Sequence, residues 1–323
     1  MREDYSIDWI IDGHCDSISF YADGQRTLTD ADPDAGQWNL SLARSARIGL
    51  QFLACYIESE YKPDRATERG LYLIQAARRF AREHVEETFL VQSREDVRRL
   101  PQPDKIGLLL SVEGGEVLND GLDILEHIYQ LGVRSLGLTW NQRNPLASGV
   151  DDPDAQRGLT PLGRQVVARM NALGMLIDVS HMNSVGFWEV LAISTKPIVA
   201  SHSCAQALCS HRRNLNDEQV LALRDQGGVL GINFYPSFLC GDGNAVRQDV
   251  IRHMQHIADV AGVSVLGLGS DFDGIAAGPR GLEDAGCYPH VMEDLRLAGF
   301  SRQEIQQITH ENFQRVLMEV LIK

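Results

Sequence analysis

The chain has 323 residues, and 30 Lys and Arg against 44 Asp and Glu give it a formal net charge of -14. Nucleic acids and anionic membrane surfaces bind clustered basic residues, so this acidic balance argues against both as partners. The hydrophobic fraction of 44% is that of an ordinary globular protein, which excludes the disordered and fibrous classes. No stretch of about 18 apolar residues is present, so a membrane-spanning helix is not expected.

The first residues, MREDYSIDWIIDGH, lack the basic region and the apolar stretch of a secretion signal. The six cysteines are scattered along the chain, and no two of them form a CxxC pair. A cytoplasmic protein with reduced thiols is the simplest interpretation of these two observations.

Eight short apolar runs are predicted to be β-strands. They are Trp9–Gly13, Leu50–Ile57, Ile106–Val112, Ser135–Thr139, Met175–Val179, Pro197–Ser201, Gly228–Phe234 and Val265–Gly269. Each run is nearly continuous rather than alternating between apolar and polar residues. This pattern is typical of strands that are buried on both faces, as in a parallel sheet covered by helices.

Between and after these strands lie segments with the apolar period of about 3.6 residues that predicts amphipathic helices. They are Ala66–His84, Leu122–Leu131, Leu162–Leu173, Asn183–Ile193, Asp217–Asp225, Val246–Ala261, Pro289–Leu297 and Ser301–Leu321. Asn216 is expected to cap the fifth of these helices, and Ser301 with Glu304 has the spacing of a capping box at the start of the last.

The alternation of strands and helices predicts a (β/α)8 TIM-type barrel, with an open doubly wound sheet as the alternative. We expect one domain over residues 1–323, because no linker or repeat divides the chain. Residues 15–49 contain no helical pattern and are expected to form a long irregular loop. Residues 289–323 are expected to form the C-terminal helices.

Active sites of such barrels are built from the residues that follow the strands. Metal-ligand residue types follow five of the eight predicted strands; they are His14 and Asp16, Glu113, His181, His202, and Asp271 with Asp273. Each of them alone has an ordinary structural interpretation, such as a capped turn, a paired carboxylate or a buried histidine. Taken together, they predict a hydrolytic site that holds two metal ions.

The spacing of these residues supports this prediction. Residues i and i+2 of an extended segment point to the same side, so His14 and Asp16 can face one ion. His181 and His202 follow neighbouring strands, which lie about 4.8 Å apart, so both rings can reach one ion. Imidazole and carboxylate ligands suit zinc.

The loop after the last predicted strand contains two acids, Asp271 and Asp273, which the i, i+2 rule places on one face. One is interpreted as the acid of the site and the other as a cap of the following turn. Arg212 and Arg213 follow the sixth strand, where a guanidinium can grip a carboxylate; the alternative is a surface arginine beside a helix. The histidines on helical stretches are interpreted as surface residues; they are His84, His127, His253, His256, His290 and His310.

The sequence resembles the membrane (renal) dipeptidase family, peptidase family M19 of the amidohydrolase superfamily, in motifs that keep the family's order over nearly the whole chain. These motifs are Asp12-Gly-His14-x-Asp16, Val112-Glu113-Gly-Gly115, Asp178-Val-Ser-His181, Ala200-Ser-His202-Ser203, Arg212-Arg213-Asn214, Asn233-Phe-Tyr235, Asp271-Phe-Asp273-Gly274 and Asn312-Phe-x-Arg315.

The resemblance implies a binuclear zinc site with two ions per chain. His14 and Asp16 are expected to bind one ion and His181 and His202 the other, with Glu113 as a bridge between them. A hydroxide between the ions would attack the peptide carbonyl. The resemblance further implies that Asp271 accepts the proton and delivers it to the leaving amine, and that Arg213 binds the substrate's C-terminal carboxylate.

One position departs from the best-known mammalian members, which carry a substrate-binding histidine in a Leu-Thr-His context. This chain has Trp140 there, in Leu138-Thr-Trp140-Asn141. The group that polarises the carbonyl is then expected to be Asn141 or a metal, and Tyr235 is a further candidate for the pocket lining.

The resemblance thus implies a zinc-dependent dipeptidase for L-Xaa-L-Xaa and L-Xaa-D-Xaa dipeptides. Two alternatives stay open: a metal-dependent amidase or deacylase that acts on N-acyl amino acids, and a catalytically inactive homologue that serves as a binding protein. Family members are often dimers, so a homodimer is one expected assembly.

Overall fold

The structure is a computed structural model that describes residues 9–29, 36–119 and 121–322. Its strands are β1 (Ile10–Cys15), β2 (Ile48–Tyr56), β3 (Thr88–Leu90), β4 (Ile106–Glu113), β5 (Val133–Gly137), β6 (Leu176–Asp178), β7 (Val199–Ser203), β8 (Val229–Ile232) and β9 (Leu266–Leu268). Each predicted strand coincides with one of these to within a few residues. The short strand β3 was not predicted, because three residues carry no periodic signal.

All strand pairs are parallel, and the sheet has the order β2-β1-β9-β8-β7-β6-β5-β4-β3. β2 also pairs with β4 over Leu50–Tyr56 and Gly107–Glu113, and this contact closes eight strands into a barrel. β3 pairs only with the start of β4 and lies outside the barrel. The predicted (β/α)8 barrel is therefore confirmed, and the open doubly wound sheet is excluded.

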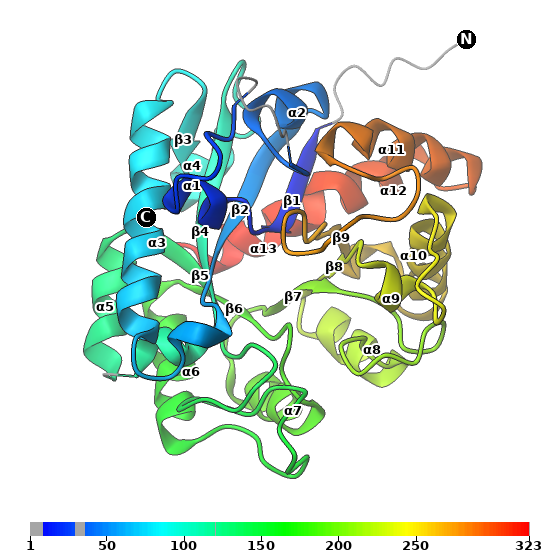
Figure 1. Ribbon diagram of the computed structural model, residues 1–323. Helices are drawn as coiled ribbons and strands as arrows, with labels where there is room; N and C mark the ends of the chain where they lie inside the picture. The colour runs from blue at the N-terminus through cyan, green and yellow to red at the C-terminus, as the bar shows by residue number, and fades with distance from the viewer. Residues whose placement is uncertain (1–8, 30–35, 120, 323) are drawn as a thin grey trace.

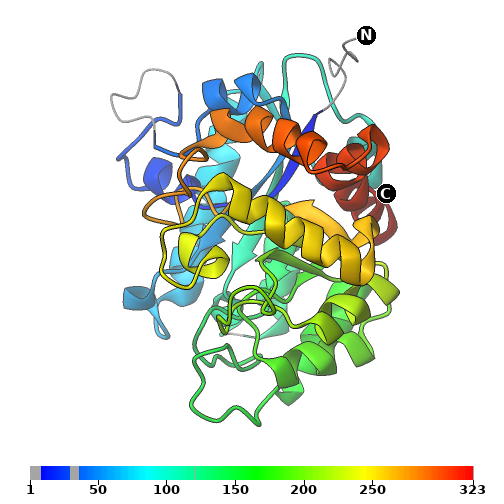
Figure 2. The same cartoon turned by 90° about the vertical axis from the view of Figure 1, so that its right-hand side faces the viewer.

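Helices surround the barrel (Figure 1). They are α1 (Ile18–Ala22), α2 (Leu40–Ser45), α3 (Ala66–Glu83), α4 (Arg94–Arg98), α5 (Leu122–Gln130), α6 (Pro161–Leu173), α7 (Ser184–Ile193), α8 (Asp217–Asp225), α9 (Pro236–Leu239), α10 (Arg247–Ala261), α11 (Tyr288–Leu297), α12 (Arg302–Gln306) and α13 (Asn312–Val320). Figure 2 shows α10 and α11, which are in contact, running side by side on the outer surface.

The predicted helices are present, and so are the two predicted caps. The Asn216 side chain accepts a hydrogen bond from the Gln219 backbone, and Ser301 and Glu304 form a capping box. The segment expected to be a long loop differs from the prediction, since it contains α1 and α2. Helices of five and six residues are too short to show an apolar period.

Helix α13 fills the barrel at the end where the strands begin. The Phe313 side chain is 1% exposed and packs with strand residues that point into the barrel. A Cβ atom on Gly13 would lie 2.7 Å from the Phe313 ring, and one on Gly267 would lie 2.5 Å from it. The absence of a side chain at these two positions therefore leaves room for the ring. His310, predicted to be a surface residue, is instead buried, and its ring stacks on Trp9 at 4.5 Å.

His253 was also predicted to lie on the surface, and this prediction is wrong as well. The side chain is 1% exposed on the inner face of α10. Its Nδ1 accepts a hydrogen bond from the Ala205 backbone at 3.1 Å, and its Nε2 lies 3.1 Å from the Leu239 carbonyl oxygen. Two backbone groups thus satisfy both ring nitrogens, which allows a buried position.

Candidate metal and substrate site

Three predicted ligands meet at the carboxyl ends of β1 and β4. His14 Nε2 lies 3.3 Å from Asp16 Oδ2 and 3.3 Å from Glu113 Oε2. All three side chains are buried, and one ligand atom from each lies within 4.8 Å of the others. The i, i+2 spacing therefore brings His14 and Asp16 to one point, and Glu113 reaches it from β4, which β2 separates from β1.

Two further predicted ligands approach the other oxygen of Glu113. His181 Nε2 lies 2.8 Å from Glu113 Oε1, and His202 Nε2 lies 3.6 Å from the same atom. The two imidazole Nε2 atoms are 2.8 Å apart. Burial lowers the pKa of His181 to about 3 and holds that of His202 well below its usual value, so both rings stay neutral, which is the form that binds metals.

The cluster fits metal ions by its chemistry. His14 Nδ1 and Nε2 and one Asp16 oxygen are buried without a hydrogen-bond partner, although such groups are rarely left unsatisfied. A Cβ atom on Gly274 would lie 2.2 Å from Asp16 Oδ2 and 2.5 Å from Asp271 Oδ1, so a glycine keeps space open beside the acids. Cations in this space would stabilise the crowded carboxylates, and imidazole and carboxylate are the ligands that zinc takes.

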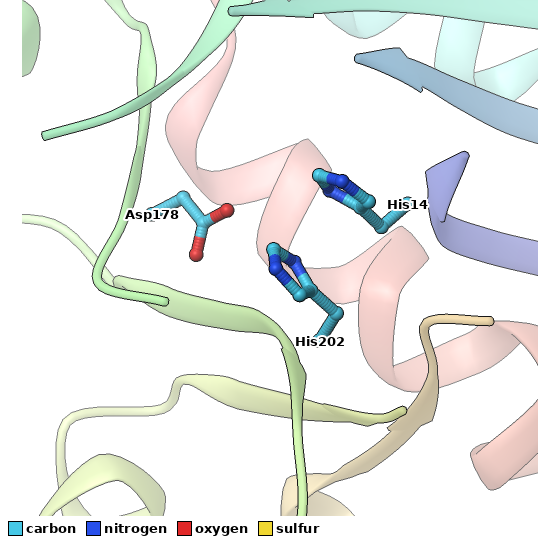
Figure 3. Close-up of side chains that lie close together, drawn as sticks. All are labelled: His14, Asp178 and His202. Atoms are coloured by element: carbon cyan, nitrogen blue, oxygen red, sulfur yellow. The ribbon is translucent and has the colours of Figure 1, made fainter. Parts of the chain in front are cut away.

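A carboxylate outside the predicted ligand set, that of Asp178, lies close to His14 and His202 (Figure 3). Asp178, the last residue of β6, accepts hydrogen bonds from the backbone N–H groups of Ser180 and Ser201 and from the Ser201 hydroxyl. The Ser201 Oγ lies 2.8 Å from His202 Nδ1. Asp178 lies within reach of the histidines, but these donors satisfy its oxygens, so we interpret it as a residue that positions His202.

A second carboxylate joins the two strands that precede the site acids. Asp12 in β1 accepts hydrogen bonds from the Ser270 backbone at 2.9 Å and from the Ser270 hydroxyl at 2.7 Å. The Asp271 backbone then donates to the His14 carbonyl oxygen at 3.2 Å. Asp12 belongs to a family motif and Ser270 directly precedes another, but their pairing across the sheet has no local signal. These contacts fix the position of His14 relative to that of Asp271.

Asp271 faces the cluster, with Oδ1 3.9 Å from His14 Nε2, and Asn233 donates to its Oδ2 at 2.9 Å. Its φ of 66° lies in the left-handed region, as does that of His181. Non-glycine residues adopt this conformation at a cost, and such strain concentrates at functional sites. Burial raises the pKa of Asp271, and the charge of Glu113 adds to this effect against the opposing effect of His14.

Asp271 and Asp273 both line the cavity beside the cluster, but their carboxylates have different partners. β9 ends at Leu268, and a φ of 64° at Asp273 turns the loop away from extended geometry. The Asp273 carboxylate accepts hydrogen bonds from Arg26 Nη2 at 2.6 Å, from the Gln37 backbone at 2.9 Å and from the Ser17 hydroxyl. The Asp273 carboxylate therefore links the segment between β1 and β2 to the loop after β9.

A cavity of about 500 Å³ opens beside the cluster, and Asp16, Glu113, His181 and Asp271 line it. Arg213 lines the same cavity and is only 4% exposed. Its Nη1 and Nη2 lie 3.4 Å from Ser203 Oγ and 3.2 Å from the His202 carbonyl oxygen, and its Nε has no hydrogen-bond partner. The alternative of a surface arginine is therefore wrong for Arg213, although it describes the exposed Arg212.

Trp140, Asn141 and Tyr235 also line this cavity. Asn141 Oδ1 lies 2.7 Å from His181 Nδ1, so Asn141 contacts a predicted ligand directly. The Trp140 ring lies 5.9 Å from the His181 ring and 5.3 Å from that of Tyr56. The ammonium group of Lys62 lies 4.8 Å from the Trp140 ring centre and 3.3 Å from a Glu116 oxygen.

A closed parallel barrel with imidazoles and carboxylates at its strand ends is the architecture of a metal-dependent hydrolase. The sequence matches the family described as membrane dipeptidase (peptidase family M19) over residues 7–321. The chain therefore belongs to this family of metallopeptidases, as the sequence motifs implied. In the described part of the chain, no helix combines the length and the apolar character needed to cross a membrane.

Individual relatives agree with this assignment. Dipeptidase aclJ of Aspergillus oryzae is 32% identical over 329 residues, which cover 96% of this chain and 78% of that protein. An uncharacterized protein in the pqqA 5' region of Klebsiella pneumoniae is 38% identical over 244 residues, which cover 72% of this chain and 88% of that protein. The crystal structure of a metallo peptidase from Rhodobacter sphaeroides, liganded with a phosphinate mimic of the dipeptide L-Ala-D-Ala, has a TM-score of 0.90 at 27% identity and covers 97% of this chain and 99% of that chain.

Proposed function

We propose that this protein is a zinc-dependent dipeptidase that hydrolyses short peptides with a free C-terminal carboxylate, of the form L-Xaa-L-Xaa or L-Xaa-D-Xaa. The observation that carries the proposal is the convergence of two ligand sets on Glu113 beside a cavity that holds the buried guanidinium of Arg213. The ligand sets alone fit many hydrolases. The buried arginine restricts the substrates to molecules with an anionic group.

In this proposal His14 and Asp16 hold one zinc ion, and His181 and His202 hold the other. Glu113 lies between the two pairs, with one oxygen toward each of them. When bound, the ions activate a water molecule as a nucleophile at neutral pH and polarise the scissile carbonyl.

Asp271 acts as the proton carrier. It accepts a proton from the attacking water and delivers it to the leaving amine. Asn233 holds one of its oxygens at 2.9 Å and leaves the other directed toward the cluster. The raised pKa of Asp271 suits this role, because a carboxylate of low pKa would take up the proton less readily.

Arg213 binds the substrate's terminal carboxylate. Burial lowers its pKa to about 10, so the guanidinium stays charged at neutral pH. A guanidinium presents its donors as a planar fork that matches a carboxylate, and the pair is strongest where water is excluded. Peptides longer than the cavity allows would place their carboxylate out of reach, which selects dipeptides.

The test is a hydrolysis screen of the purified protein with zinc supplied. The panel contains L-Xaa-L-Xaa and L-Xaa-D-Xaa dipeptides, the same dipeptides as C-terminal amides, and N-acyl amino acids. We expect the free dipeptides to be hydrolysed, and elemental analysis to find close to two zinc ions per chain. Activity on N-acyl amino acids alone would favour the deacylase alternative. Full dipeptidase activity of a preparation without metal would overturn the proposed chemistry.

The cytoplasmic location and the homodimer stay predictions from the sequence. All six cysteines are free thiols in the structure. Sedimentation analysis of the purified protein measures the assembly directly.

A further inference from the structure

One wall of the cavity carries a histidine that the sequence analysis did not single out. His211 lines the same cavity as Arg213, two residues away in the loop after β7. Its ring packs on that of Phe238, with the ring centres 4.5 Å apart. The Arg213 guanidinium carbon lies 5.4 Å from the centre of the same Phe238 ring. Phe238 thus supports the imidazole and the guanidinium as neighbours in one wall.

A backbone contact determines which nitrogen of His211 carries the hydrogen. The Arg213 backbone N–H donates to His211 Nδ1 at 3.2 Å, so Nδ1 is the acceptor. The neutral ring then carries its hydrogen on Nε2. Burial, with the charges of Arg213 and Arg212, lowers the pKa of His211, which keeps the ring neutral at neutral pH. Among the residues that the structure describes, none accepts a hydrogen bond from His211 Nε2.

Arg213 also has hydrogen-bonding capacity that the protein does not use. Its Nε is buried without a partner, and its other two contacts, at 3.4 and 3.2 Å, are long. A buried guanidinium with an unsatisfied donor is unfavourable unless a ligand completes its hydrogen bonds. A carboxylate has two oxygens and about four acceptor positions, so it can receive donors from two side chains together.

We propose that His211 is a specificity-determining residue that donates a hydrogen bond from Nε2 to the substrate carboxylate that Arg213 binds. This inference rests on the proposed dipeptidase function. It assigns the recognition of the free carboxylate to a pair of side chains, one charged and one neutral. The fixed tautomer makes the neutral partner a donor only, so the pair accepts an anionic end and disfavours an amide NH2 at the same point.

The experiment compares a free dipeptide with the same dipeptide as its C-terminal amide. His211→Phe keeps a ring that can pack on Phe238 but has no N–H group. We expect this variant to raise KM for the free dipeptide about tenfold, to change kcat less than about twofold, and to leave kcat/KM for the amide nearly unchanged. His211→Gln, whose side-chain NH2 can replace the Nε2 donor, should recover most of the lost affinity.

A KM of His211→Phe equal to that of the unmodified protein would overturn the inference, and so would an equal loss with the free dipeptide and its amide. Zinc content and circular dichroism of each variant check that the fold is intact. If His211→Phe does not fold, His211→Ala provides the same comparison. Failure of the unmodified protein to hydrolyse any dipeptide would instead contradict the proposed function itself.

Discussion

Arg26 and Asp273 form a buried ion pair, with Arg26 Nη2 2.6 Å from Asp273 Oδ2 and side chains that are 7% and 6% exposed. The pair joins the connection after β1 to the loop after β9. The first of these segments follows directly on Asp16, and the second carries Asp271. The Arg26–Asp273 pair therefore holds Asp16 and Asp271 in place relative to each other, although neither of them takes part in it.

Arg26→Met should destabilise the protein strongly. The substitution leaves the Asp273 carboxylate buried without its counter-charge, and breaking buried pairs in this way costs about 3–5 kcal/mol. Urea unfolding measures the loss. Arg169→Met is the matched control, because it breaks an ion pair with Glu126 on the protein surface, where such pairs contribute little. Equal losses in the two variants would contradict a structural role of the Arg26 pair.

Asp271→Asn should retain zinc and lose turnover. The amide removes the group that takes up the proton, and loss of such a group lowers kcat by about 10²–10⁴-fold. Asp259→Asn makes the same chemical change at an exposed position of α10 and should leave kcat unchanged. Steady-state kinetics with elemental analysis distinguish the two effects. A variant of Asp271 that keeps full turnover would show that another group carries the proton.

Arg213→Lys should raise KM for dipeptides about tenfold or more while kcat changes less. A lysine keeps the charge but offers a point donor instead of a planar fork. Arg224→Lys is the matched control, since the Arg224 side chain lies on α8 outside the cavity and pairs with Asp225. Initial rates over a range of dipeptide concentrations separate KM from kcat. An unchanged KM in the Arg213 variant would contradict carboxylate binding at this residue.

His253 should make the protein less stable in mild acid. Burial lowers its pKa in the folded state from 6.5 to about 4. Between these values the unfolded chain binds a proton that the folded chain does not, so the free energy of unfolding falls as the pH falls, by up to about 1.4 kcal/mol per pH unit.

This effect can be isolated with His253→Gln, which has no titrating group. From pH 7.5 to 5.5 the unmodified protein should lose about 1 kcal/mol more stability than the variant. Urea unfolding at both pH values, with zinc present in excess, provides the comparison. Parallel losses in the two proteins would mean that His253 does not titrate on unfolding.

Much of the barrel was predictable from the sequence, because parallel barrel strands are buried on both faces. β4 shows this directly, since all eight of its residues are buried and the run of apolar residues ends at Glu113. Ligands that follow such runs are visible without a structure, because strand ends converge on one face of a barrel. The placement of His14, His181 and His202 near Glu113 follows from this rule.

What the sequence did not reveal depends on contacts between distant segments. Asp178 orients His202 through Ser201, and Asp273 binds Arg26, and neither contact has a local signal. The burial of His253 did have a local signal in the sequence, because His253 lies between Val250 and Ile257 on the apolar face of α10. In that case the helical period was a better guide than the polarity of the residue.

The packing of Phe313 against Gly13 has a consequence for the metal cluster. A methyl group at position 13 would meet the Phe313 ring at 2.7 Å and the Leu268 carbonyl oxygen at 3.1 Å, so the strand would have to move. The next residue in the chain is His14. The Phe313 ring thus packs against the same short strand that carries the first proposed zinc ligand, so a side chain at position 13 that shifts this strand would also displace His14.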